Sequence, residues 1–136
     1  MKNRRVLLAS LVALAVLLLA LPIAACGQKT AAPTREVRIG IMGGQTGPAA
    51  AAVNNMIADI ENTFKYINNV ENGVSGAKLS WRIVDDKGTT EGSVLAYKEL
   101  RESYDPLFYI AVEDYCFLGV KDMMVQDKAT TFTLAV

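Results

Sequence analysis

The sequence predicts an α/β fold, an open doubly wound parallel sheet with strand order 2-1-3-4. Three observations support this. From Val37 on, short apolar segments alternate with longer amphipathic ones, and turns rich in Gly, Pro, Asp and Asn separate them. Each predicted helix is long enough to return the chain to the same end of the sheet, and such crossovers are right-handed, so consecutive strands lie parallel.

The first strand is predicted at 37–42, where apolar residues alternate with Arg38 and Gly40. A glycine-rich turn follows, in which Pro48 fits the first helical position and Thr46 or Gly47 can cap the helix. Apolar residues then recur at steps of three and four as far as an Asn-Gly turn, which predicts a long helix. These residues are Val53, Met56, Ile57, Ile60, Phe64 and Ile67.

The second half of the pattern repeats this order. A strand at 79–84 runs into an acidic turn at 85–88, and Thr89 or Thr90 can cap the next helix, which Asp105-Pro106 closes. A nearly all-apolar strand at 107–112 is expected to be covered on both faces. A third helix leads to a fourth strand at 131–136. The residues expected to face inward from these two helices are Val94, Leu95, Leu100, Phe117, Val120 and Met124, with Met123 also in the core.

Composition excludes several classes of function. The 136 residues include 14 basic and 14 acidic side chains, which argues against a nucleic-acid partner, and there is no His. Without His the commonest zinc ligand and the usual general base are absent, so we expect no metal site and no enzyme. The turn at 43–48 fits neither the dinucleotide fingerprint nor the phosphate-binding loop, and no cofactor is expected.

The first 26 residues have the pattern that is typical of an export signal. Three basic residues precede an apolar run at 6–21, and Ile23-Ala24-Ala25-Cys26 resembles the lipobox of bacterial lipoproteins. We therefore expect a signal peptide at 1–25, a lipidated Cys26 and a flexible tether over 26–36. The domain would be exported to the cell envelope, held on the outer face of the cytoplasmic membrane or in the periplasm. A plain secretory signal or an uncleaved anchor is the alternative.

The candidate site lies where the winding of the sheet reverses, between the loops at 43–47 and 113–116. Glycines let a ligand approach the backbone of the first loop, although an ordinary strand-to-helix turn has the same composition. Asp85 and Asp86 could bind a hard cation or act as acid and base. Because adjacent residues of a strand point to opposite faces, a turn-capping and solvated role is favoured. Cys116 is expected to be buried rather than joined to another chain.

The segments VRIGIMGGQTGP, IVDD and LFYIAV, with the helices and the Asn-Gly turn between them, resemble one family over 37–136. It comprises the type I periplasmic solute-binding proteins of ABC importers, the leucine-binding-protein-like receptors for branched-chain amino acids and amides. The resemblance implies a small-molecule solute held between two α/β lobes, an ABC permease as partner, a membrane attachment through the lipid anchor, and no catalysis. The chain would supply an incomplete first lobe, the N-terminal fragment of such a receptor, and would bind weakly alone.

The resemblance also implies ligand-binding residues. Gln45, Thr46 and Gly47 match the first-strand loop that lines the cleft, whereas Tyr115 and Cys116 lie where many members have a Gly followed by small hydroxyl residues. A phenol, a thiol and the nearby Glu113-Asp114 pair make a neutral or cationic solute conceivable. Two other classes of function remain open. One is an exported lipoprotein sensor or partner-binding module that is complete as it stands, and the other is a flavodoxin-like or hydrolase-type enzyme.

Overall fold

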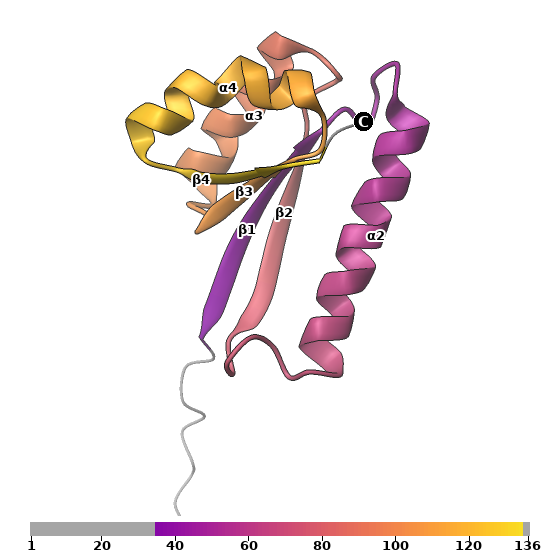
Figure 1. Ribbon diagram of the computed structural model, residues 1–136, viewed down its shortest axis with the longest axis vertical. Helices are drawn as coiled ribbons and strands as arrows, with labels where there is room; N and C mark the ends of the chain where they lie inside the picture. Colours follow the sequence, from indigo (N-terminus) through magenta and orange to yellow (C-terminus); the bar gives the residue numbers. More distant parts are fainter. Residues whose placement is uncertain (1–34, 135–136) are drawn as a thin grey trace, which may run out of the picture. The chain divides into compact units, whose positions relative to one another are not determined.

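The computed structural model describes residues 35–134, in which strands and helices alternate (Figure 1). The predicted signal peptide, Cys26 and nearly all of the tether lie outside the described residues. The elements are β1 (Glu36–Gly43), α2 (Ala50–Asn69), β2 (Lys78–Asp85), α3 (Thr90–Ser103), β3 (Phe108–Ala111), α4 (Asp114–Asp127) and β4 (Thr130–Thr133). No helix among the described residues is long and apolar enough to span a membrane.

The four strands form one parallel sheet in the order β2-β1-β3-β4, which confirms the predicted topology. Ile41 of β1 pairs with Ile83 on one side and with Ile110 on the other. Helix α2 lies on one face of the sheet and helices α3 and α4 on the other (Figure 1). This division follows from right-handed crossovers, because the chain moves toward one edge after β1 and toward the opposite edge after β2.

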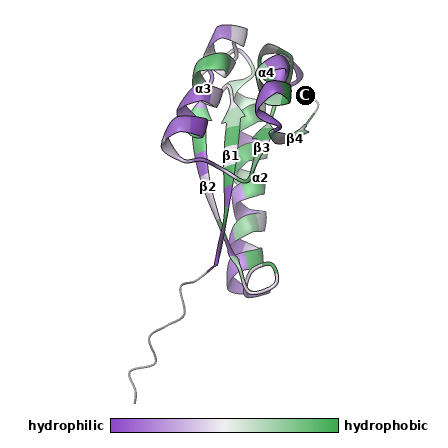
Figure 2. Cartoon of the chain, turned by 90° about the vertical axis from the view of Figure 1, so that its left-hand side faces the viewer, coloured by the Kyte–Doolittle hydropathy of each residue, from purple (hydrophilic) through white to green (hydrophobic). Residues whose placement is uncertain are grey.

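Two apolar clusters hold the layers together. On the α2 face, Ile39, Ile41 and Val53 are fully buried, and each such side chain contributes roughly 1.5–3 kcal/mol. On the other face, Met42, Tyr97 and Leu100 belong to a second cluster, joined by Met124 and by the partly buried Met123 and Phe117 as expected. Apolar residues line the strands in Figure 2, while the outer surface of α3 is largely polar.

Helix α2 is also fastened to β2. The indole N–H of Trp81 donates to Glu61 Oε1 at 2.9 Å, and the Trp81 and Phe64 rings meet edge to face with centroids 5.4 Å apart. At the end of the helix, Asn68 donates to the Leu79 carbonyl at 2.7 Å and accepts from the Leu79 N–H at 2.8 Å. The α2–β2 layer therefore combines apolar packing with hydrogen bonds at both ends of the contact.

The beginning of α2 differs from the prediction. The helix begins at Ala50, with Ala49 at the N-cap and no side-chain cap, so Pro48 does not occupy the first helical position. Thr46 lies three residues before the N-cap, and its hydroxyl donates to Asp85 Oδ2 at 2.5 Å instead. The cap of α3 was predicted correctly: Thr89 Oγ1 accepts from the Gly92 N–H at 3.0 Å.

Two predictions about burial were wrong. Leu95 is 67% exposed, because the inward stripe of α3 runs through Ser93, Ala96, Tyr97 and Leu100 at steps of three, one and three residues. Strand β3 is not closed on both faces. Tyr109 and Ala111 are buried against α3 and α4, but Ile110 borders an apolar hollow of about 360 Å³ between α2 and β4. The fourth strand is shorter than predicted, and Phe132 on it is 57% exposed.

Candidate functional site

Three loops meet at the carboxyl ends of β2, β1 and β3. We call them the first loop (44–49), the second loop (86–89) and the third loop (112–113). The strand register brings them together, since Gly43 pairs with Asp85 and Met42 pairs with Ala111. The sheet order changes direction at β1, so the candidate site lies at the reversal that the sequence predicts.

Glu113 connects the third loop to the first. Its side chain is 1% exposed, and its Oε2 accepts the Gly44 N–H at 2.8 Å. The other carboxylate oxygen accepts the hydroxyl of Tyr115. The predicted negative charge near the site is therefore inside it, as a buried carboxylate that holds a backbone N–H of the opposite loop.

The buried carboxylate of Asp86 holds the second loop through hydrogen bonds. It is fully buried, and its two oxygens accept the Gly88 N–H at 2.9 Å and the Ser93 hydroxyl at 3.2 Å. The expectation of a solvated Asp86 was wrong, because α3 and α4 close over it; the turn-capping role is confirmed by the Gly88 bond. Cys116 is fully buried, as expected, and hydrogen-bonds Asp86. Burial, and then the Asp86 carboxylate, raise the pKa of its thiol.

Asp85 points the other way, toward the first loop. Its carboxylate accepts the Thr46 hydroxyl and the Thr46 and Lys87 N–H groups, the last at 2.9 Å. Desolvation would raise the pKa of Asp85, but these hydrogen bonds together outweigh it and hold the pKa below its usual value. The two adjacent carboxylates thus serve different loops. Among residues 35–134 no group of three or more acidic, Cys or His side chains could hold a metal ion.

The lowered pKa of Asp85 predicts a pH-dependent contribution to stability. A carboxyl whose folded pKa lies below its unfolded value stabilises the fold above about pH 4 and loses that contribution as the pH falls through the folded pKa. Thr46→Val removes the hydrogen bond that lowers the pKa of Asp85 the most. We expect the variant to be less stable than wild type at pH 7, with the difference shrinking steadily below pH 4, in urea unfolding monitored by circular dichroism.

Thr63→Val is the matched control, because the Thr63 hydroxyl donates to the backbone carbonyl of Asp59 at 2.8 Å rather than to a side chain that titrates. Its effect on stability should be the same at every pH. A Thr46→Val deficit that stays constant from pH 7 to pH 2.5 would contradict the assignment of the lowered pKa to this bond.

The structure brings some of the five predicted site residues together and separates others. A methyl group built on Gly88 would lie 3.1 Å from the Tyr115 hydroxyl and 3.3 Å from the Gly47 Cα, so Tyr115 and Gly47 lie on either side of Gly88. Gln45 instead faces α2, where its amide N–H donates to Asn54 Oδ1 at 3.3 Å. Thr46 is bonded to Asp85, and Cys116 lies beneath the loops.

Tyr115 is the aromatic side chain of the site, and it reaches solvent at 37% exposed. Desolvation of its hydroxyl and the bond to Glu113 both raise the pKa of the phenol. It therefore stays protonated at neutral pH and acts as a hydrogen-bond donor. Sequence reasoning placed Glu113 in the site loop and considered Asp86 as a cation ligand, but it did not predict that Glu113, Asp86 or Gly88 would bind the ligand. The signal for Glu113 was its position at the end of an apolar strand and the start of a helix.

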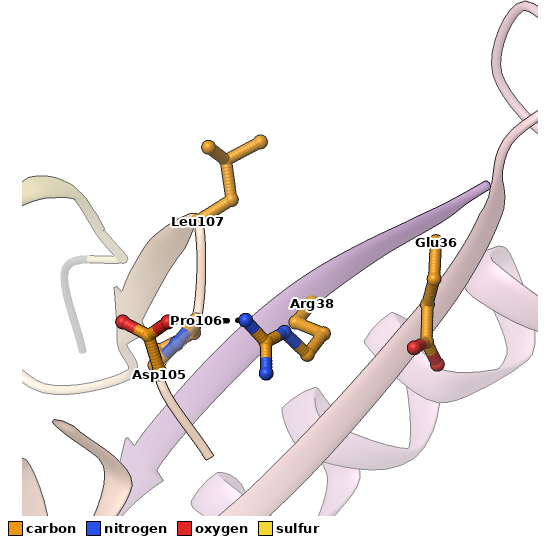
Figure 3. Close-up of a pocket in the computed structure, with 5 residues that line it drawn as sticks. All are labelled: Glu36, Arg38, Asp105, Pro106 and Leu107. Atoms are coloured by element: carbon orange, nitrogen blue, oxygen red, sulfur yellow. Dashed lines mark hydrogen bonds and ion pairs between the residues drawn. The ribbon is translucent and has the colours of Figure 1, made fainter. Parts of the chain in front are cut away.

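A second hollow lies at the opposite, amino end of the strands (Figure 3). It measures about 350 Å³ and is lined by Glu36, Arg38, Asp105, Pro106 and Leu107. Arg38 and Asp105 form an ion pair at 3.1 Å, but both side chains are well exposed, and such pairs contribute little. The figure shows Leu107 pointing away from the pair. These residues do not converge on one point as the loops at the carboxyl ends do.

Comparison with known proteins finds matches in structure. No family model matches the sequence, and no curated protein matches it. The branched-chain amino acid transporter substrate binding protein LivJ from Streptococcus pneumoniae, in complex with isoleucine, is 13% identical with a TM-score of 0.69, over 75% of this chain and 30% of that one. A possible leucine/isoleucine/valine-binding protein from Rhodopirellula baltica is 20% identical with a TM-score of 0.68, over 76% and 29%.

A third similar structure is an extracellular ligand-binding receptor from Verminephrobacter eiseniae, 24% identical with a TM-score of 0.63, over 74% of this chain and 28% of that one. This chain thus spans less than a third of the length of the solved structures that it matches. At these identities the likeness establishes the fold, and it agrees with the strand order and with the alternation of strands and helices. The chain therefore has part of the α/β fold of the type I periplasmic solute-binding proteins of ABC transporters.

Proposed function

We propose that this chain is part of the solute-binding component of an ABC importer for branched-chain amino acids, amides or similar small solutes. It would work with an ABC permease and catalyse no reaction. The observation that carries the proposal is the meeting of the first and third loops at the reversal of a sheet with this fold. Two of the similar structures hold small molecules, isoleucine in one and 3,4-dihydroxybenzoic acid in the other.

The chemistry of the loops supports reversible binding rather than catalysis. Gly47 and Gly88 let the first and second loops pack closely against each other, and Tyr115 places a protonated phenol beside them. The Cys116 thiol is buried with a raised pKa, and a protonated thiol is a poor nucleophile. A single set of loops contacts one side of a small solute, so we expect only millimolar affinity for this chain alone.

The test is an NMR titration of the isotopically labelled full-length chain in detergent, which detects millimolar binding residue by residue. Leucine, valine, leucinamide, acetamide and urea are added in turn. We expect at least one of them to shift the backbone amides of Gly44, Gly47 and Gly88 while those at the amino ends of the strands stay unchanged. Shifts confined to the hollow around Arg38, or no shifts with any of these solutes, would contradict the proposal.

The envelope location also belongs to the proposal. Cys26 follows a branched aliphatic and two small residues, and its thiol would carry the lipid that tethers the domain outside the cytoplasm. Incorporation of an alkyne-labelled fatty acid in a bacterial host should occur in the full-length chain and disappear in Cys26→Ser. Labelling of Cys26→Ser at the wild-type level would contradict lipidation at this residue.

A second candidate function is an exported lipoprotein whose α/β domain binds a partner or senses a signal without transport. The apolar hollow between α2 and β4 favours it, because Phe132 and Ile110 line an open apolar surface beside the sheet edge. A stable monodisperse oligomer in analytical ultracentrifugation, lost in Phe132→Asp, together with no shift from the solute panel, would favour this function over solute binding.

A further inference from the structure

The three carboxylates at the candidate site use the backbone N–H groups that face it. Glu113 takes the N–H of Gly44, Asp85 takes those of Thr46 and Lys87, and Asp86 takes that of Gly88. These are the donors that two glycine-containing loops would offer to an anionic group of a ligand. In this chain they are already occupied by side chains of the protein itself.

No basic side chain forms an ion pair with these carboxylates, and the one basic residue of the second loop, Lys87, is exposed. The ion pairs found within residues 35–134 join Arg38 to Asp105, Lys65 to Glu61, and Arg101 to Asp127, and none includes a carboxylate of the site. The carboxylates of Asp85, Asp86 and Glu113 are held by uncharged donors: N–H and O–H groups and, at Asp86, the Cys116 thiol. An incoming carboxylate would meet both occupied donors and negative charge at short range, and such repulsion is strong where water is largely excluded.

Glu113 has the most direct effect on what can bind. It is nearly fully buried between the first and third loops, 2.8 Å from the Gly44 nitrogen. A methyl group built on Gly44 would lie 3.1 Å from Glu113 Oε2 and 2.7 Å from the Gly88 nitrogen, so the carboxylate occupies the space where all three loops converge. Its second oxygen faces the Tyr115 hydroxyl, the part of the site open to solvent.

We propose that Glu113 is a specificity-determining residue that excludes carboxylate head groups and selects solutes presenting an uncharged or cationic hydrogen-bond donor, such as an amide or an amine. This inference rests on the proposed function, since it names the class of solute for the same site. Glu113 occupies the position an anionic group would take, and because the Tyr115 hydroxyl donates its proton to Glu113, the exposed Tyr115 oxygen offers an acceptor in its place.

The experiment uses three probes that share the leucine side chain and differ in their head groups: leucine has an ammonium and a carboxylate, leucinamide has an ammonium and a neutral amide, and N-acetyl-leucinamide is uncharged. Each is titrated into the labelled full-length chain, and the amides of Gly44, Thr46 and Gly88 report binding. We expect leucine to bind at least about tenfold more weakly than leucinamide, which corresponds to about 1.4 kcal/mol. Equal affinity for both amides shows that an uncharged donor is enough, whereas tighter binding of leucinamide shows that the cation contributes.

The variant Glu113→Gln keeps the size of the side chain and an acceptor for Gly44 but removes the charge. Its preference for leucinamide over leucine should fall to within about threefold. Asp114→Asn is the matched control, because Asp114 lies one residue away, is exposed and has no side-chain hydrogen bond or ion pair with the described residues 35–134; it should keep the wild-type preference.

The outcomes separate the two proposals. Leucine that binds wild type as tightly as leucinamide overturns the role of Glu113 and leaves solute binding at this site intact. If Glu113→Gln does not fold, the wild-type comparison of the three probes still decides. If none of the probes shifts a loop amide in wild type, the proposed function at this site is overturned.

Discussion

Gly92→Ala is expected to destabilise the fold by at least about 3 kcal/mol, and to leave the chain largely unfolded if its stability is typical of a small domain. A methyl group at this position in α3 would lie 1.8 Å from the Asp86 carbonyl oxygen and 2.7 Å from its carbon. These are backbone atoms of the second loop, which Ser93 and Gly88 hold in place through the Asp86 carboxylate. Neither the helix nor the loop can move away without breaking these bonds.

Gly92→Ala is expected to destabilise the fold, although replacing Gly by Ala within a helix usually stabilises it. Ala is the better helix former by about 1 kcal/mol, so the same substitution in an open helix stabilises it. Gly119→Ala in α4 is the matched control: its methyl group would lie 2.9 Å from Thr90 Cγ2, which can rotate away, and 3.2 Å from the Thr90 carbonyl oxygen, a contact that a shift of a few tenths of an ångström relieves. We expect Gly119→Ala to change the free energy of unfolding by no more than about 1 kcal/mol. Equal urea midpoints for the two variants would contradict the argument.

Asp86→Ala is expected to cost about 2–4 kcal/mol. The substitution leaves the Gly88 N–H and the Cys116 thiol without their buried acceptor and removes one of the two bonds of the Ser93 hydroxyl, and each buried polar group without a partner costs about 1–3 kcal/mol. The second loop should lose its conformation first, since its left-handed Gly88 depends on the Asp86 bond. Urea unfolding gives the size of the loss.

Asp85→Ala is the control for Asp86→Ala. It removes an adjacent carboxylate of the same charge whose partners lie on the more exposed side of the loop, and we expect it to cost about 1 kcal/mol. Asp86→Asn, which keeps the shape and one acceptor, should fall between the two alanine variants. An Asp86→Ala variant as stable as Asp85→Ala would show that the buried carboxylate does not hold the loop.

The topology could be predicted because it depends on properties that the sequence displays directly. The spacing of Ile39 and Ile41, the helical period from Val53 to Ile67 and the handedness of crossovers are enough to give four parallel strands and their order. The N-cap of α3 at Thr89 could also be predicted from the sequence, because a cap involves residues within one helical turn.

The errors concern interactions between residues far apart in the sequence. Thr46 was assigned to cap α2, but its hydroxyl reaches Asp85, which is 39 residues away. Glu113 is a buried acceptor for Gly44, 69 residues away, and nothing next to it in the sequence indicates that. Asp86 was predicted to be solvated because the segment 85–88 has the composition of a surface turn. The loops that the sequence places at the reversal of the sheet do meet there, whereas the hydrogen bonds between them join residues far apart in the sequence and could not be predicted from it.

The contact between α2 and β2 gives the chain a built-in optical probe. Trp81 is its single tryptophan, and the indole is held against Phe64 and bonded to Glu61 of α2. Its fluorescence therefore follows the docking of that helix specifically, while far-ultraviolet circular dichroism follows α2, α3 and α4 together. If the two signals diverge during unfolding, α2 separates from the sheet as an independent step; if they coincide, both faces of the sheet unfold together.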